Sequence, residues 1–175
     1  MGKRQGQSGT PATVALEAAG VPYTAHHYAH RAQSEGYGAE AARALHVSPA
    51  RVFKTLMVAT GAQADRDLAV AIVPADSTLD LKACAQALGC KRVQMADPQA
   101  AQRRTGYVLG GISPFGQRHL SPTVIDRSAL EHESIFLSGG RRGFSLELAP
   151  ERAVAFLGAS VAPVASGTSL PAERG

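Results

Sequence analysis

A chain of 175 residues, 45% hydrophobic and 18% charged, is long enough to bury a substantial core and too apolar to be intrinsically disordered. Its 18 Lys and Arg residues against 14 Asp and Glu give a formal charge of +4, which favours an anionic partner without identifying it. Two cysteines argue against a disulfide framework or a zinc site, and the polar N-terminus carries no apolar signal or membrane-spanning stretch, so we expect a cytoplasmic protein.

The sequence predicts one domain over residues 10–158. Residues 1–9 are polar and rich in glycine, which is typical of a disordered lead. Residues 159–175 are rich in Ala, Pro, Ser and Gly, and we expect them to form a flexible tail. No internal repeat or long linker divides the chain between these two ends.

The first predicted elements are a helix, an extended segment and a second helix. Thr10-Pro11 supplies an N-cap hydroxyl followed by a proline in the first turn, and Gly20 ends this helix. Residues 21–28 are then extended. Residues 35–45 form the second helix, and Ser48-Pro49 marks a break before the next strand.

The middle of the chain contains the strongest strand pattern. Residues 52–59 are apolar on both faces, which is typical of a central strand, and residues 68–73 pair with them as a hairpin. A helix begins at residues 78–80 and ends at Gly89. A short strand over residues 91–95 and a helix over residues 97–105 follow.

Residues 105–116 interrupt this pattern, because four glycines and a proline surround two short apolar runs. Gly110-Gly111 followed by Ser113-Pro114 predicts a loop whose backbone amides face a bound molecule, although an ordinary turn after a strand has the same composition. Residues 138–143 form a second segment of this kind. The two segments are candidates for the walls of one pocket.

The last predicted elements are three strands and a helix. The strands cover residues 122–126, 134–137 and 144–148, and the third pairs back onto the second across a turn at Gly139-Gly140. The helix runs from Pro150 to residue 157. Strands in hairpins and helices that occur singly predict an α/β fold with a mixed, largely antiparallel sheet.

Lys54 lies inside the strand over residues 52–59, on an apolar face that it shares with Leu56 and Val58. Partial desolvation disfavours the charged ammonium unless an anion is bound beside it, so Lys54 is a candidate for holding a phosphate or a carbonyl oxygen. A lysine that extends from the strand to water fits the sequence equally well.

Three hydroxyl groups lie beside the strand or the glycine segments, on Thr55, Ser113 and Ser138. Each could orient a carbonyl group or a water molecule, although serine beside glycine is also routine in turns. The chain has neither a G-x-S-x-G motif nor a recognisable Ser, His and Asp pattern, so a nucleophilic serine is unsupported.

Three histidines, His26, His27 and His30, lie close together around Tyr28. An extended segment without an acidic ligand is not typical of a zinc site, so we expect neither a metal nor a cofactor. The histidines are better candidates for the surface or the rim of a pocket, and Tyr28 is the more interesting pocket residue.

Basic pairs occur at Lys91-Arg92, Arg103-Arg104 and Arg141-Arg142, together with Arg118-His119. If folding gathers them near the glycine segments, they form a rim that follows the phosphates of a polynucleotide end; scattered, solvated charges are the alternative. Trp is absent and only 5% of residues are aromatic, which argues against a platform for stacking the bases of a single strand.

Four segments, in this order, resemble the YbaK/EbsC family of stand-alone aminoacyl-tRNA deacylases: Val52-Phe53-Lys54-Thr55-Leu56, Met95-Ala96-Asp97-Pro98, residues 105–114 and residues 138–143. The resemblance runs from about residue 10 to residue 158. It implies a mixed sheet that curls into a barrel-like core with helices outside. The editing domain inserted in some prolyl-tRNA synthetases is related to this family.

The resemblance also implies which residues act. Lys54 is then the catalytic lysine, and the substrate-binding residues are Tyr28, His30, Thr55, Gly110, Gly111, Ile112, Ser113, Ser138, Gly139 and Gly140. Ser145 stands where some members have Asp, which puts an acid at that position in doubt.

The implied activity is trans-editing hydrolysis of mischarged Cys-tRNA(Pro), with the ribose hydroxyl or the cysteine thiol of the substrate in place of a protein nucleophile. The implied partners are tRNA and prolyl-tRNA synthetase, and no membrane is involved. Two alternatives stay open: a deacylase for Ala-tRNA(Pro) or a broader set of esters, and a non-catalytic module that binds tRNA ends or the synthetase.

Overall fold

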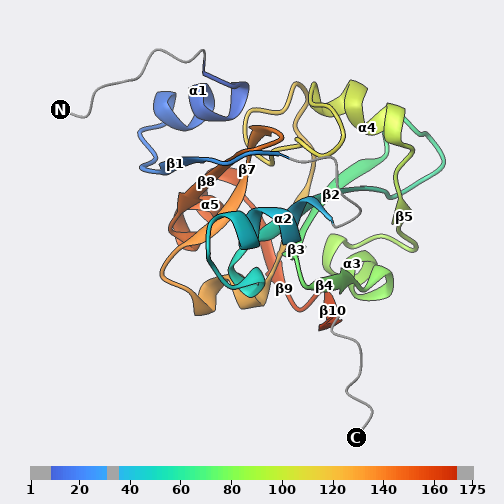
Figure 1. Ribbon diagram of the computed structural model, residues 1–175. Coiled ribbons are helices and arrows are strands. Elements are labelled where there is room, and N and C mark those ends of the chain that lie inside the picture. The colour runs from blue at the N-terminus through green and yellow to red at the C-terminus, as the bar shows by residue number, and fades with distance from the viewer. Residues whose placement is uncertain (1–8, 31–35, 169–175) are drawn as a thin grey trace, which may run out of the picture.

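The computed structural model describes residues 9–30 and 36–168, which form helices packed around three sheets (Figure 1). The regular elements are, in chain order, α1 (Pro11–Ala18), β1 (Thr24–His27), α2 (Tyr37–Ala44), η1 (Pro49–Arg51), β2 (Phe53–Ala59), β3 (Leu68–Pro74), β4 (Ser77–Leu79), α3 (Leu81–Leu88), β5 (Gln94–Met95), α4 (Pro98–Thr105), β6 (Thr123–Asp126), η2 (Arg127–Glu131), β7 (Ile135–Arg141), β8 (Phe144–Leu148), α5 (Pro150–Leu157), β9 (Ser160–Ala162) and β10 (Ala165–Thr168).

The largest sheet has the strand order β5-β2-β3-β6-β9. β2 and β3 form the predicted antiparallel hairpin, whereas β6 lies parallel to both β3 and β9. A second sheet has the order β1-β8-β7, and β10 pairs with β4 in a third. Five of these seven strand pairs are antiparallel, so the prediction of a mixed, largely antiparallel α/β fold is confirmed.

β3 has a buried side chain at all of its positions and separates two hydrophobic cores. Val70 and Ile72 face a core shared with α1, α5 and the β7–β8 pair, while Ala71 and Val73 face a core shared with α3. Figure 1 shows α1 and α3 at opposite ends of the molecule. Because β2 pairs with β3, β2 also has an apolar neighbour on each face, as its sequence predicts.

The two larger sheets meet where β2 approaches β7. Val52 and Phe136 form a single parallel bridge there, and both side chains are buried. Within the described ranges the hydrogen-bonded strands remain three separate sheets. The barrel-like curl that the resemblance implies is therefore limited to this contact between β2 and β7, because one bridge does not extend the ladder around the core.

The turn predicted at Gly139-Gly140 was wrong. β7 continues to Arg141, and the chain reverses at residues 142–143. The two glycines lie inside the strand at a register shift, where Gly140 has a φ of +106° and a Cβ on Gly139 would lie 2.2 Å from the ring of Phe144. A bulge and a closely packed ring therefore require the glycines.

The first part of the expected flexible tail is ordered. Residues 160–162 and 165–168 form β9 and β10, which pair with β6 and β4. Val164 between them is fully buried, and the backbone amides of Val164 and Ala165 donate hydrogen bonds of 2.9 and 2.8 Å to Oδ1 of Asp126. These long-range contacts override a composition that is typical of loops.

The other terminal predictions fall mostly outside the described residues. Residues 1–8 of the predicted lead and residues 169–175 of the predicted tail are not among them, and Gly9 lies in no regular element.

The helix predicted from residue 78 begins at Leu81 instead, because Asp80 is its N-cap and Ser77–Leu79 pair with β10. None of the helices in residues 9–30 and 36–168 is long and apolar enough to cross a membrane.

Candidate functional site

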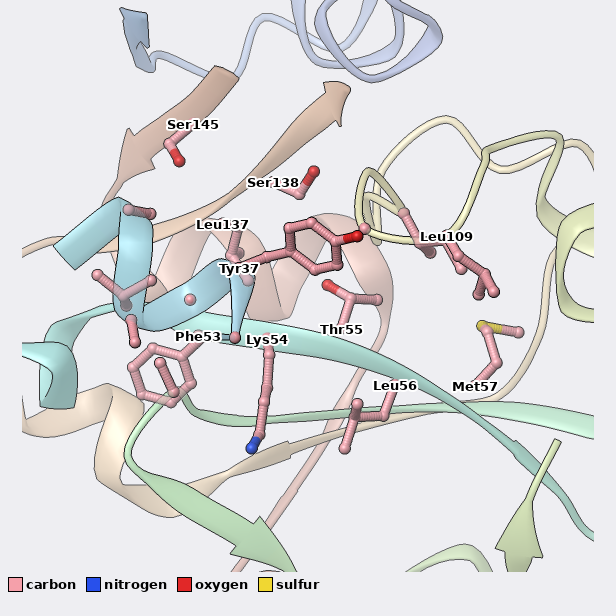
Figure 2. Close-up of a pocket in the computed structure, with 18 of the residues that line it drawn as sticks. Tyr37, Phe53, Lys54, Thr55, Leu56, Met57, Leu109, Leu137, Ser138 and Ser145 are labelled. Carbon is pink, nitrogen blue, oxygen red and sulfur yellow. The ribbon is translucent and has the colours of Figure 1, made fainter. Parts of the chain in front are cut away.

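A cavity of about 690 Å³ lies between α2, β2, the loop over residues 105–116 and the β7–β8 pair (Figure 2). Most of its wall is apolar. Its polar side chains come from Tyr28, Tyr37, Lys54, Thr55, Ser138, Arg141 and Ser145. A volume of this size is typical of sites that bind a small molecule or one end of a larger one.

The two glycine segments contact each other beside this cavity, and each contributes some residues to its wall. The guanidinium of Arg142 donates a hydrogen bond of 2.9 Å to the carbonyl oxygen of Leu109. A Cβ on Gly111 would lie 2.9 Å from the Cα of Arg141, so a side chain there would push the two backbones apart. Glycine at this position thus allows the loop to close against the β7–β8 turn.

Side chains inside the loop over residues 105–116 hold its shape. The hydroxyl of Tyr107 donates to the carbonyl oxygen of Phe115 at 2.6 Å, and Ser113 Oγ accepts from the Phe115 amide at 3.2 Å. Burial raises the pKa of Tyr107 to about 12, so the hydroxyl stays protonated and keeps donating at neutral pH. Ser113 is fully buried and supports the loop instead of lining the cavity.

Tyr37 reaches from α2 across the cavity towards this loop (Figure 2). Gly110 has a φ of +85°, and a Cβ there would lie 2.5 Å from Cζ of Tyr37. The guanidinium of Arg142 lies over the ring, 5.0 Å from its centroid. Tyr37, Gly110 and Arg142 therefore form one packed contact between α2 and the two glycine segments, which we call the Tyr37 ledge.

Thr55 and Ser138 face the cavity on the same side of β2 as Tyr37 (Figure 2). Thr55 Oγ1 is buried and has no hydrogen-bond partner among the described residues. Ser138 Oγ accepts a bond of 3.2 Å from the amide of Gly140. An unpaired buried hydroxyl destabilises the empty protein by about 1–3 kcal/mol, so Thr55 has a hydrogen bond available for a ligand.

Lys54 also lines the cavity, but its side chain leaves β2 on the side opposite to Thr55 (Figure 2). The alternation of side chains along a strand requires this. Burial lowers the pKa of Lys54, and the nearby carboxylate of Asp76 opposes that change. Lys54 is therefore partly desolvated, which is one of the two alternatives that its sequence left open, and its ammonium points away from Ser138 (Figure 2).

Tyr28 and Ser145 form another part of the wall, where the segment after β1 meets β8. The amide of Tyr28 donates a hydrogen bond of 3.0 Å to the carbonyl oxygen of Gly143. Burial raises the pKa of the Tyr28 hydroxyl, and a hydrogen bond with Ser145 opposes that change. Tyr28 therefore stays neutral at physiological pH and can act as a hydrogen-bond donor.

Tyr28, Lys54, Thr55, Gly110, Ile112 and Ser138 are the predicted site residues that line the cavity. His30, Gly111, Ser113, Gly139 and Gly140 do not. His30 Nδ1 lies 2.7 Å from Glu40 Oε1, and its ring centroid lies 5.7 Å from that of Tyr37, so it supports Tyr37 from outside the cavity.

The three clustered histidines have different neighbours. His26 Nε2 lies 2.9 Å from Glu147 Oε1, and the ring of His27 stacks on Phe144 with a centroid distance of 4.7 Å. Within residues 9–30 and 36–168, no group of three or more His, Cys, Asp or Glu side chains could hold a metal ion.

Sequence reasoning missed Tyr37 and Leu109, which extend the cavity wall from α2 and the glycine loop. Both side chains are large and exposed, with 44% and 41% of their surface accessible. An aromatic residue placed between Gly36 and Gly38 was the available signal, because small neighbours leave a large ring uncovered.

Comparison with known proteins gives this site a context. A family model described as "Aminoacyl-tRNA editing domain" matches residues 35–156. A protein of Enterococcus faecalis named as a candidate Cys-tRNA(Pro)/Cys-tRNA(Cys) deacylase, EbsC, is 35% identical over 152 residues, which cover 86% of this chain and 90% of that protein. The proline–tRNA ligase of Moorella thermoacetica is 35% identical over 78 residues, covering 45% of this chain and 13% of the ligase.

A solved structure has the same fold. The crystal structure of a candidate trans-editing enzyme for prolyl-tRNA synthetase matches with a TM-score of 0.77 and 22% sequence identity, covering 92% of this chain and all of the other. At this identity, the match supports the arrangement of helices and strands that we describe.

Proposed function

Because this chain belongs to the aminoacyl-tRNA editing domain family, we propose that it is a trans-editing deacylase that hydrolyses the ester of mischarged Cys-tRNA(Pro). The relative from Enterococcus faecalis carries the name of such a deacylase. Proline and cysteine are similar in size, so a synthetase pocket discriminates weakly between them, and a second site that destroys the wrong ester restores accuracy.

The chemical make-up of the cavity wall is the observation that carries this proposal. The described residues that line it include hydroxyls and one lysine but no His, Cys, Asp or Glu. Apart from Lys54, this part of the wall thus has no side chain able to act as a general base near neutral pH, and it has no nucleophile paired with a histidine or carboxylate. An aminoacyl ester is already activated, so a site that orients it and stabilises negative charge on its carbonyl oxygen is sufficient.

We assign the attacking group to the substrate. In one route the terminal ribose hydroxyl orients a water that attacks the ester carbonyl, giving free cysteine and tRNA. In the other the cysteine thiol attacks its own carbonyl: an S–C bond forms, the C–O bond to ribose breaks, and the thiol proton ends on the ribose oxygen. In either route we assign to Thr55 the role of holding the substrate, because its buried hydroxyl has no described partner.

The residues with roles in this proposal are Lys54, Thr55, Ser138 and the amides around Gly110. Lys54 lies on β2 and contributes a positive charge to the cavity wall. In this proposal it holds either the carbonyl oxygen of the ester or a phosphate of the terminal nucleotide. Its side chain points away from Thr55 (Figure 2). Kinetics can distinguish a contact to the carbonyl oxygen from a contact to the phosphate. Loss of a contact to the oxygen lowers kcat, and loss of a contact to the phosphate raises KM.

A deacylation assay with the purified chain tests the function. We expect release of cysteine from Cys-tRNA(Pro) without any other protein, and a kcat/KM lower by about 100-fold in Lys54→Ala, as for loss of one charge-stabilising donor. Lys82→Ala is the matched control, because Lys82 is exposed on α3 and does not line the cavity. Full turnover by a folded Lys54→Ala protein would remove this lysine from the mechanism.

The choice of ester distinguishes the substrates and the routes. Side-by-side assays of Cys-tRNA(Pro) and Ala-tRNA(Pro) decide which aminoacyl group is preferred. A 2-aminobutyryl ester has nearly the shape of the cysteinyl ester without the thiol, so its survival would select the thiol route and its cleavage the water route.

Tight tRNA binding with no cleavage of any ester would instead favour a non-catalytic module. Adding prolyl-tRNA synthetase to the same assays tests the proposed partner, which should increase selectivity for tRNA(Pro).

A further inference from the structure

Tyr37 is unusual among the aromatic residues of this chain. The chain has four Tyr and five Phe, all in the described ranges, and Tyr37 is the most exposed of these nine side chains, with 44% of its surface accessible. The other eight are buried or half-buried. The single exposed ring also lies in the wall of the cavity, so part of its surface is available to a ligand.

The Tyr37 ledge holds this ring in one orientation. The Arg142 guanidinium lies 5.0 Å from the ring centroid and is itself fixed by its bond to Leu109. The ring of His30, fixed in turn by Glu40, lies 5.7 Å away at an interplanar angle of 37°. Gly110 leaves space for the ring where any side chain would collide with it. An exposed ring held by neighbours on several sides loses little conformational freedom when a flat ligand stacks on it.

The chemistry of the substrate places a flat ligand at this position. The ester that the proposed function hydrolyses is carried by the ribose of the terminal nucleotide, so the terminal base lies only one sugar away from the ester. With the aminoacyl group beside Thr55 and Ser138, a base one sugar away falls beside Tyr37, which lines the cavity on the same side of β2 as these two hydroxyls (Figure 2). Aromatic and arginine side chains are the usual stacking surfaces for unpaired bases.

We propose that the Tyr37 ledge is the stacking surface for the terminal adenine of the aminoacylated tRNA. This inference rests on the proposed function for the identity of the ligand. Composition argued against a platform for several bases of a single strand, and the structure is consistent with that, because one ring serves one base. Stacking contributes about 1–3 kcal/mol per base, which corresponds to a change in affinity of about 5- to 150-fold.

Fluorescence of the terminal base tests the proposal without requiring catalysis. The probe is an acceptor-stem RNA minihelix that ends in 2-aminopurine and carries cysteine through an amide bond, which resists hydrolysis. The chain has no Trp, so the emission of 2-aminopurine is measured against a low background. We expect the wild type and Tyr37→Phe to quench this emission on binding. Tyr37→Leu should lose the quenching and bind about 10-fold more weakly.

Matched controls separate stacking from misfolding. Tyr23→Phe alters a tyrosine whose hydroxyl bonds Glu17 outside the cavity wall, and it should quench as the wild type does. A minihelix with an abasic terminal nucleotide should bind wild type and Tyr37→Leu equally. Equal quenching by Tyr37→Leu and wild type, binding by the wild type without quenching, or no binding would each overturn the proposal. Quenching without cleavage of the corresponding esters would instead contradict the deacylase function and leave the stacking surface in place.

Discussion

At the scale of single residues, the site depends on glycines whose neighbours exclude any side chain. Gly110 combines a φ of +85° with a ring of Tyr37 that a Cβ would approach to 2.5 Å. Gly20 also has a positive φ, of +69°, but a Cβ there would meet nothing within 4 Å. Alanine substitutions at Gly110 and Gly20 can therefore separate the effect of backbone strain from the effect of a collision in the cavity wall.

Gly110→Ala should therefore lose activity, whereas Gly20→Ala should not. Each substitution forces alanine into the left-handed region and destabilises the fold by about 1–2 kcal/mol. Only Gly110→Ala also displaces Tyr37 and Arg142, so we expect its KM for the aminoacyl-tRNA to rise about 10-fold through loss of the stacking surface. Urea unfolding and steady-state kinetics on both variants measure the two effects. An unchanged KM in Gly110→Ala would show that Tyr37 can move without consequence.

The sequence predicted several site residues correctly as cavity wall and could not predict others. Lys54 and Thr55 stood out because a polar pair interrupts an apolar strand, and Gly110 because glycine clusters mark special backbone geometry. Ser113 belongs to the same motif, yet its hydroxyl bonds the loop's own backbone. Whether a loop hydroxyl faces inward or outward depends on a single dihedral angle, which motif spacing does not determine.

At the scale of elements, Asp126 fixes the end of the fold to its centre. Its carboxylate accepts hydrogen bonds from the amides of Val164 and Ala165 and from both the amide and the hydroxyl of Ser128. Burial alone would raise the pKa of Asp126, but these hydrogen bonds outweigh it and hold the pKa below the ordinary value of 3.8. One side chain thus joins β6, η2 and the β9–β10 segment.

The stability contributed by Asp126 should depend on pH. Because its pKa is lower in the folded state, the contribution is complete above the unfolded pKa of about 3.9 and is lost as the pH falls through the folded value. Asp126→Asn should reduce the free energy of unfolding by about 2 kcal/mol at pH 7, with a smaller difference at pH 2. Urea unfolding at the two pH values provides the measurement. Asp97→Asn is the control, since asparagine caps a helix about as well as aspartate does.

The elements themselves were largely predictable where local signals were strong. The N-cap of α1, the β2–β3 hairpin and α5 follow from Thr10-Pro11, from two apolar runs and from Pro150. The predictions of a turn at Gly139-Gly140 and of a flexible chain over residues 159–168 were wrong for one reason. Their conformation is set by partners far away in the sequence, Phe144 packed on a bulge in one case and Asp126 in the other.

At the scale of the whole molecule, the formal charge of +4 comes mainly from arginines, which are 14 of the 18 basic residues. Arg141 lies in the cavity wall and Arg142 on the Tyr37 ledge, while Arg103 is paired with Asp65 at 2.7 Å on an exposed surface. The folded chain therefore concentrates some of its positive charge at the site and neutralises some of it elsewhere. A tRNA that binds as we propose meets Arg141 and Arg142 at the cavity.

Binding of RNA should accordingly weaken with salt. If three or four phosphates are contacted, the affinity for an acceptor-stem minihelix should fall about 10- to 100-fold between 50 and 200 mM salt. Titrations over this range give the slope of log affinity against log salt concentration. A slope near zero would mean that phosphates contribute little and that the aminoacyl end and its base supply the affinity.

The strict alternation along β2 has a consequence for how this protein can vary. Lys54 and Thr55 are adjacent in the sequence but extend from opposite sides of the strand, and seven paired positions with β3 fix which side each takes. A single-residue insertion or deletion ahead of them would exchange the ammonium and the hydroxyl and invert both cores at once. Variation in this strand is therefore restricted to substitutions, whereas changes of length must be accommodated in the loops.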